Sequence, residues 1–179
     1  MPRYIAFLRS INVGGRTVKM DDLRRLFESM GFSGVETFIA SGNVIFESNS
    51  KNAKSLETKI TGKLHQALGY EVATFVRSVH ELAAIANHKL FTRRQDGSGL
   101  YIAFLSEPAS EAAKAKLTSL QTKTDIFHFQ GRELYWVCLT RFSDSTLSGP
   151  LLEKMLGTRA TVRNSNTIKK IAIALGAGP

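Results

Sequence analysis

An α+β fold of two tandem ferredoxin-like plaits, each a split β-α-β unit, is predicted by three features of the sequence. The pentapeptide Tyr-Ile-Ala-Phe-Leu occurs at residues 4–8 and again, letter for letter, at residues 101–105. Each copy opens the same succession of patterns: strand, helix, strand, strand, helix, strand. The Thr-Val-Arg at 161–163 resembles the Thr-Phe-Val-Arg at 74–77, so the two halves also end alike. Together these repeats indicate an internal duplication.

The first half begins with a central strand. The apolar run 4–8 is too short for a surface helix, and two glycines stop it within a few residues. The helix that follows carries apolar residues at three- and four-residue spacing, with aspartates in its first turn. The elements expected in this half are a strand at 4–8, a helix from Met20 to Gly31, strands at 35–39 and 44–47 joined by a hairpin, a helix at 53–68 and a strand at 71–77.

A connecting helix and a linker separate the two halves. Ser78 and Glu81 stand three residues apart like a capping box and open the connecting helix. Residues 92–99 are polar and glycine-rich and form the expected linker between subdomains 1–91 and 100–179. The elements expected in the second half are strands at 101–105, 125–129, 134–139 and 160–163, helices at 110–120 and from Pro150 to Gly157, and a C-terminal helix.

Composition limits the class of protein. The chain has 179 residues, 43% of them hydrophobic, which suffices for a sizeable core. Apolar runs stay far below the roughly 20 residues that span a bilayer, so we expect no membrane segment and no signal peptide. The single cysteine, Cys138, lies in a strand-like run and allows no intrachain disulfide or cysteine-based metal cage. A cytoplasmic location without a metal site is the expectation.

The charge balance favours an anionic partner. The formal net charge is +9 and the pI is about 9.9, and lysines and arginines bind phosphates with release of counterions. Both halves are mildly basic, and after Glu153 the chain carries basic residues with no acid. The alternative interpretation is a solvated basic surface without a partner.

Two polar loops are candidates for a binding site. In a split β-α-β unit, the loop after the first strand and the hairpin after the second emerge at the same end of the sheet, roughly 10 Å apart. Glycine amides near a helix N-terminus bind anions well, although the spacing matches neither phosphate-loop nor dinucleotide fingerprints. The alternative is that both segments are only tight turns. The candidate residues are Arg9, Asn12, Gly14, Gly15, Ser41 and Asn43.

A second candidate precedes the C-terminal helix. Arg163, Asn164 and Asn166 come just before it, and Lys169 and Lys170 lie in its first turns. Basic side chains at a helix N-terminus oppose the macrodipole, so an anion pocket is one interpretation. The other is that an asparagine here simply caps the helix.

Metal binding, catalysis and single-stranded RNA binding are only weakly indicated by this sequence. The four histidines lack metal-ligand spacing, and no nucleophile, base and acid stand together, so we expect no catalytic residues. Phe127, Phe129, Tyr135 and Trp136 are similar to the aromatic sheet surface of single-strand RNA readers, but the basic-aromatic consensus is absent. Core packing is the alternative for these rings.

Three motifs resemble an uncharacterised bacterial family, domain-of-unknown-function family 1697. They are Leu-Arg-Ser-Ile-Asn-Val-Gly-Gly at 8–15, Ser-Gly-Asn-Val-Ile-Phe at 41–46, and Thr-Val-Arg-Asn-Ser-Asn-Thr at 161–167. The resemblance implies paired ferredoxin-like subdomains and brings no established activity, substrate or cofactor. Ser10 stands where that family has glycine, and Ser165 where it often has an aromatic residue.

The sequence therefore predicts a non-catalytic binder of an anionic ligand, either a nucleotide-like small molecule or nucleic acid. Two other classes remain open. One is an enzyme acting on a phosphorylated or carboxylated metabolite, with Arg9, Asn12 and Asn43 as polar anchors. The other is a structural interaction module, such as a homodimer.

Overall fold

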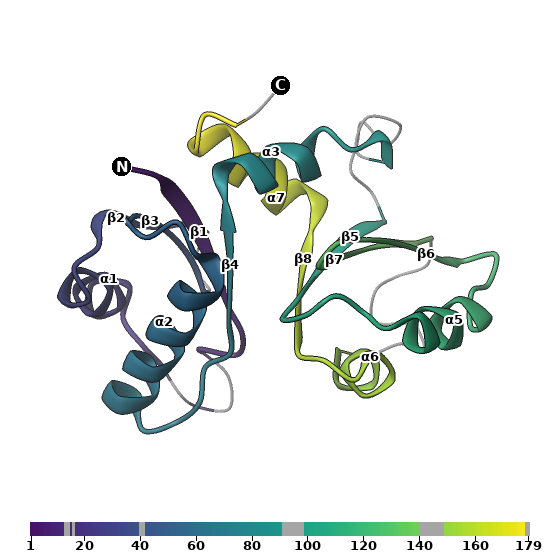
Figure 1. Ribbon diagram of the computed structural model, residues 1–179, viewed down its shortest axis with the longest axis horizontal. Helices are drawn as coiled ribbons and strands as arrows, with labels where there is room; N and C mark the ends of the chain where they lie inside the picture. Colours follow the sequence, from purple (N-terminus) through teal and green to yellow (C-terminus); the bar gives the residue numbers. More distant parts are fainter. Residues whose placement is uncertain (13–14, 16, 40–41, 91–98, 140–148, 178–179) are drawn as a thin grey trace. The chain divides into compact units, whose positions relative to one another are not determined.

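A computed structural model describes residues 1–12, 15, 17–39, 42–90, 99–139 and 149–177 of the chain (Figure 1). The chain forms two compact units. The first unit comprises Met1–Ala86 together with Lys170–Pro179, and the second unit comprises Asn87–Lys169. Most of the expected linker, 92–98, lies outside the described residues. The C-terminal residues from Lys170 group with the first unit, whereas the sequence placed them with the second half.

The first unit contains a four-stranded antiparallel sheet with the strand order β2-β3-β1-β4. Figure 1 shows α1 and α2 on one face of this sheet. The elements are β1 (Arg3–Leu8), α1 (Met20–Ser29), β2 (Ser33–Thr37), β3 (Asn43–Glu47), α2 (Ala53–Leu68), β4 (Thr74–Ser78) and α3 (Val79–Ala86).

The second unit repeats this plan. Its sheet is also antiparallel and has the strand order β6-β7-β5-β8, with α5 and α6 packed on one face (Figure 1). The elements are β5 (Leu100–Leu105), α5 (Glu111–Ser119), β6 (Asp125–Gln130), β7 (Glu133–Cys138), α6 (Gly149–Leu156) and β8 (Ala160–Asn164). The last helix, α7 (Ser165–Ala174), begins in the second unit and belongs to the first unit from Lys170 onward.

The repeated pentapeptide occupies equivalent strands, as predicted. Both β1 and β5 stand third in their sheets, each between two antiparallel neighbours. The register is equivalent too, since Ile5 lies opposite Arg77 and Ile102 lies opposite Arg163. The prediction of two tandem ferredoxin-like plaits is therefore confirmed.

Each central strand is buried on both faces. Tyr4, Ala6 and Leu8 of β1 pack with α1 and α2 in one core cluster. Ile5 and Phe7, on the opposite face, are also fully buried. An uninterrupted apolar run is the sequence pattern of such a strand, because neither face requires polar side chains.

Local sequence patterns predicted most helix ends well, but they misplaced the end of β2 and the start of β4. The capping box at the start of α3 is confirmed: the Ser78 amide donates to Glu81 Oε2 at 2.8 Å, and the Glu81 amide donates to Ser78 Oγ at 3.1 Å. The expectation that a strand continues to Ile39 is wrong, since β2 ends at Thr37 and Ile39 has a left-handed φ of 50°. The strand expected from residue 71 begins only at Thr74, as β4. Among the described residues, no helix is long and apolar enough to cross a membrane.

Candidate functional site

The hairpin between β2 and β3 contacts the last residue of β1, where the loop of residues 9–12 begins. The Leu8 amide donates to the Gly42 carbonyl oxygen at 2.7 Å. A Cβ built on Gly42 would lie 2.7 Å from the Leu8 carbonyl oxygen, so this position tolerates no side chain. The hairpin reaches β1 because β3, which follows Gly42, pairs directly with β1. We call residues 9–12, 15, 39, 42 and 43 the loop surface.

Both candidate asparagines fix the backbone of their own loops. Asn12 Oδ1 accepts a hydrogen bond from the Val18 amide at 2.7 Å. Asn43 Nδ2 donates to the Phe38 carbonyl at 3.1 Å, and Asn43 is only 3% exposed. Asn12 differs in being exposed, and its amide nitrogen has no hydrogen-bond acceptor among the described residues. Asn43 therefore has a structural role, whereas Asn12 also offers a donor to a ligand.

Backbone strain is concentrated at the loop surface. Ser10 has a φ of 57° and Ile39 a φ of 50°, and they are the non-glycine residues with positive φ in the described part of the chain. A left-handed φ is a genuine outlier for a β-branched residue, and the side chain of Ile39 is 42% exposed. The positive φ of Ser10 also explains why glycine, which adopts this conformation without strain, suits this position in the family that the three motifs resemble.

The structure describes two of the four remaining loop candidates, Arg9 and Gly15. Gly15 has a φ of 78° and open space where a Cβ would stand, so it serves the turn rather than a close approach. Arg9 is half-buried, and its amide donates to the Ala73 carbonyl at 2.9 Å. Gly14 and Ser41 lie outside the described residues. Tyr70 Oη donates to the Ile11 carbonyl at 2.9 Å, which anchors the loop further.

The second candidate cluster lies where β8 meets α7. Asn164 Oδ1 accepts from the Thr167 amide at 2.8 Å, so the helix-capping interpretation is confirmed for Asn164. Asn166 is exposed on the first turn of α7. Arg163 Nη1 donates to Thr161 Oγ1 at 2.8 Å and to the Val162 carbonyl at 3.0 Å. Burial lowers the pKa of Arg163 to about 10. Nothing in these contacts brings Asn166 together with Arg163.

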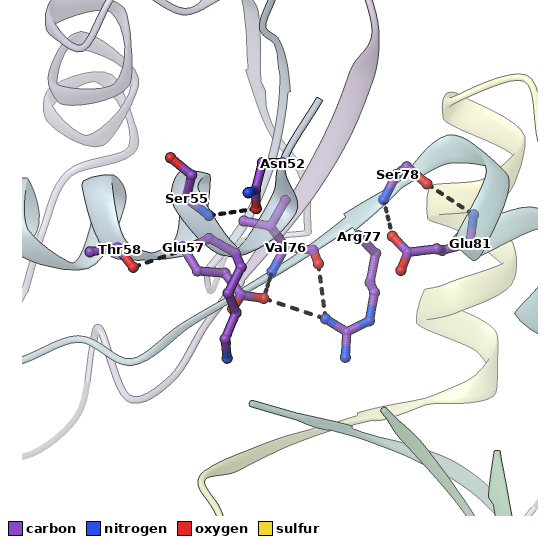
Figure 2. A network of polar contacts seen from close by, with 9 residues as sticks. Asn52, Ser55, Glu57, Thr58, Val76, Arg77, Ser78 and Glu81 are labelled. Carbon is purple, nitrogen blue, oxygen red and sulfur yellow. Dashed lines mark hydrogen bonds and ion pairs between the residues drawn. The ribbon is translucent and has the colours of Figure 1, made fainter. Parts of the chain in front are cut away.

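A buried ion pair in the first unit was not predicted (Figure 2). Arg77 is fully buried, and its Nη1 lies 3.5 Å from Glu57 Oε1 and donates to the Val76 carbonyl at 2.9 Å. Glu57 Oε1 also accepts from the Val76 amide at 2.9 Å, and Glu57 Oε2 lies 3.6 Å from Lys54 Nζ. Because β4 is an edge strand, the Glu57 carboxylate satisfies a backbone donor that β1 does not bind.

The corresponding strand of the second unit uses a related arrangement. Glu153 on α6 accepts from the Ala160 amide of the edge strand β8 at 2.9 Å. Arg163 contacts the carbonyl of the preceding valine just as Arg77 does. The repeated Val-Arg dipeptide, followed by the capping residues Ser78 and Asn164, was the sequence signal of this duplicated strand end. These contacts give the dipeptide a structural role in both units.

The aromatic residues of the second unit belong mainly to its core. Phe127, Phe129 and Trp136 belong to the cluster formed with α5 and α6, and Trp136 Nε1 donates to the buried Asp125 Oδ1 at 2.9 Å. Tyr135 alternates to the other face of β7 and lies in contact with two histidines. Tyr135 is buried there as well, so packing in or against the core accounts for all four rings. In the described ranges, no group of histidines, cysteines and acids is arranged to hold a metal ion.

The fold and the loop surface define a class of duplicated ferredoxin-like α+β proteins with fixed polar loops at one end of the first sheet. The chain belongs to the family described as "Protein of unknown function (DUF1697)", whose sequence model matches residues 1–135. The motifs at 8–15 and 41–46 lie inside this match, and the motif at 161–167 lies beyond it. The family assignment made from these motifs is confirmed.

A solved structure has the same fold. The chain is similar to the conserved bacterial protein SP0830 from Streptococcus pneumoniae, with 24% sequence identity and a TM-score of 0.76. The similarity covers 98% of this chain and 99% of that chain. No curated protein matches the sequence.

Proposed function

We propose that the protein is a non-catalytic binder of an anionic ligand, and that the loop surface of the first unit is the binding site. The observation that carries the proposal is the pair of strained residues, Ser10 in the loop after β1 and Ile39 in the hairpin that is hydrogen-bonded to the end of β1. Left-handed non-glycine residues cost about 1–3 kcal/mol each and concentrate at ligand sites, where geometry matters more than stability.

The preference for an anion rests on charge and on hydrogen-bond donors. Arg9 directly follows β1, and the exposed Asn12 amide presents a donor in the same loop. The net charge of +9 increases the encounter rate with anions of any size. A nucleotide-like molecule is favoured over a long nucleic acid, because the described loop surface contributes one arginine rather than a row of basic residues.

The substitution Asn12→Asp tests this site without removing its loop contact. An aspartate still accepts a hydrogen bond from the Val18 amide, but it replaces the donor amide with a negative charge. We expect the variant to keep its melting temperature within a few degrees and to bind adenosine monophosphate at least about tenfold more weakly, as like charges repel in a partly desolvated site. Binding would be measured by isothermal titration calorimetry.

Gln66→Glu is the matched control, since it makes the same change in charge at an exposed position of α2. Under the proposal it leaves the affinity for adenosine monophosphate unchanged. Equal losses in both variants would mean that net charge alone attracts the nucleotide and that the loop surface is no site. Failure of adenosine monophosphate, pyrophosphate and a short oligothymidine to bind the wild-type protein would refute anion binding itself.

Salt dependence distinguishes the two anionic classes. If oligothymidine binds through six or more phosphates, its affinity should fall by several powers of ten between low and moderate salt. A mononucleotide at the loop surface should lose far less affinity, because few counterions are released.

A further inference from the structure

A separate cavity of about 290 Å³ lies within the second unit, at the outer edge of its sheet. Its apolar lining comes from Leu90, Ile126, Val137 and Tyr135, and it is bordered by Phe127, whose ring packs against the core on the helix side of the sheet. Its polar lining comes from Lys89, Gln121 and His128. The cavity thus combines an ammonium group, a carboxamide and an imidazole with an apolar floor, and its described lining contains no carboxylate.

The wall of this cavity is held in place by stacked rings. The His88 ring stacks on the Tyr135 ring with centroids 4.2 Å apart and an interplanar angle of 23°. The His128 ring stands 5.2 Å from His88 and meets Tyr135 edge-on at 6.0 Å. Tyr135 is only 2% exposed, so its buried ring is a fixed base on which the half-buried His88 ring stacks.

The protonation state of His88 supports a preformed platform. His88 Nδ1 accepts a hydrogen bond from the Leu90 amide at 3.2 Å, which requires an unprotonated Nδ1. Burial, the neighbouring His128 and Lys89 lower the pKa of His88, while a hydrogen bond with Gln130 opposes them. The positive charge at the cavity therefore comes mainly from Lys89, on the exposed side of the lining.

Size and chemistry select the ligand class. Cavities for drug-sized ligands measure about 300–1,000 Å³, so this one fits a molecule of one ring and excludes a dinucleotide. A ring fits the aromatic and aliphatic floor, and a carboxylate fits the ammonium, amide and imidazole donors. We propose that the second unit contains a binding site for a small planar aromatic carboxylate. This site is independent of the loop surface of the first unit.

Histidine NMR signals provide a direct test, with benzoate and its uncharged analogue benzamide as the probes. Benzoate should shift the imidazole signals of His88 and His128 saturably, with half-saturation at about 1 mM, as expected for so small a ligand. Signals of His65 and His80, which are exposed on helices of the first unit, should stay unchanged. Benzamide should bind at least about fivefold more weakly, because it lacks the charge that Lys89 attracts.

Two variants complete the test. Lys89→Gln should weaken benzoate binding at least about fivefold and leave benzamide binding unchanged, since only the charged contact is lost. Asn12→Asp, at the loop surface, should leave both titrations unchanged, which separates failure of this proposal from failure of the proposed function. Equal affinities for benzoate and benzamide, or shifts shared by all four histidines, would overturn the proposal even if no variant folded.

Discussion

Gly42 and Gly15 have the same backbone conformation, so the difference between their alanine variants measures how tightly Gly42 packs against β1. Gly42 has a φ of 79° and Gly15 a φ of 78°. A Cβ on Gly42 would meet the Leu8 carbonyl oxygen at 2.7 Å and Ile11 Cγ2 at 3.4 Å, whereas one on Gly15 meets nothing within 4 Å. The substitutions Gly42→Ala and Gly15→Ala therefore share the conformational cost and differ in the steric one.

The expected losses of stability follow from these two contributions. A left-handed alanine costs about 1–2 kcal/mol relative to glycine, and this cost applies to both variants. Gly42→Ala also presses a methyl group against a backbone oxygen that is fixed in the sheet, and overpacking of this kind costs about 1–3 kcal/mol more. We expect Gly15→Ala to lose about 1 kcal/mol of unfolding free energy and Gly42→Ala about 3 kcal/mol.

The assay must report on the first unit. Trp136 is the single tryptophan and lies on β7 of the second unit, so its fluorescence follows that unit. Native-state hydrogen exchange of the β1 amides measures the free energy of opening in the first unit. Both variants would be compared with the wild type at β1, and Trp136 fluorescence in urea would serve as the internal reference.

The reasoning fails if the two alanine variants are equally stable. Such a result would mean that the hairpin moves away from Leu8 at little cost, and that the loop surface is not rigid. If Gly42→Ala loses stability and also binds the ligand more weakly, while Gly15→Ala keeps the wild-type affinity, the contact between Gly42 and Leu8 would be linked to ligand binding.

Further predictions concern the buried polar groups. Arg77→Met should cost about 3 kcal/mol in urea unfolding because it leaves the Glu57 carboxylate buried without this partner, and adding Glu57→Gln should recover part of the loss. Asn43→Ala should cost about 1–3 kcal/mol, since the amide group that binds the Phe38 carbonyl is lost, and an unchanged urea midpoint would contradict this. Because the folded-state pKa of His88 is lowered, the unfolded chain binds its proton more readily. Stability should therefore fall as the pH drops below about 6.5, and His88→Gln should flatten this slope.

Sequence periodicity and the repeat were sufficient for the fold. The Tyr-Ile-Ala-Phe-Leu repeat placed β1 and β5 correctly because a strand buried on both faces is apolar at every position. The Ser78 capping box was recognisable because its two hydrogen bonds join residues three apart. Both features depend on local sequence alone.

Contacts between distant residues could not be predicted in this way. Glu57 and Arg77 lie on different elements, and nothing in either local sequence indicates the other. The stacking of His88 on Tyr135 likewise depends on where the chain passes after α3. The sequence left the roles of Asn12 and Asn43 open for a different reason. Asparagine stabilises turns and binds ligands equally well, so its presence in a loop does not distinguish the two roles.

The most direct measurement of anion binding at the loop surface is amide chemical-shift mapping during titration with adenosine monophosphate. The proposed function predicts saturable shifts at Ile11, Asn12, Gly15 and Gly42, with the β6 and β7 amides unchanged. Shifts absent from these four residues, or confined to the second unit, would contradict the assignment of the site to the loop surface.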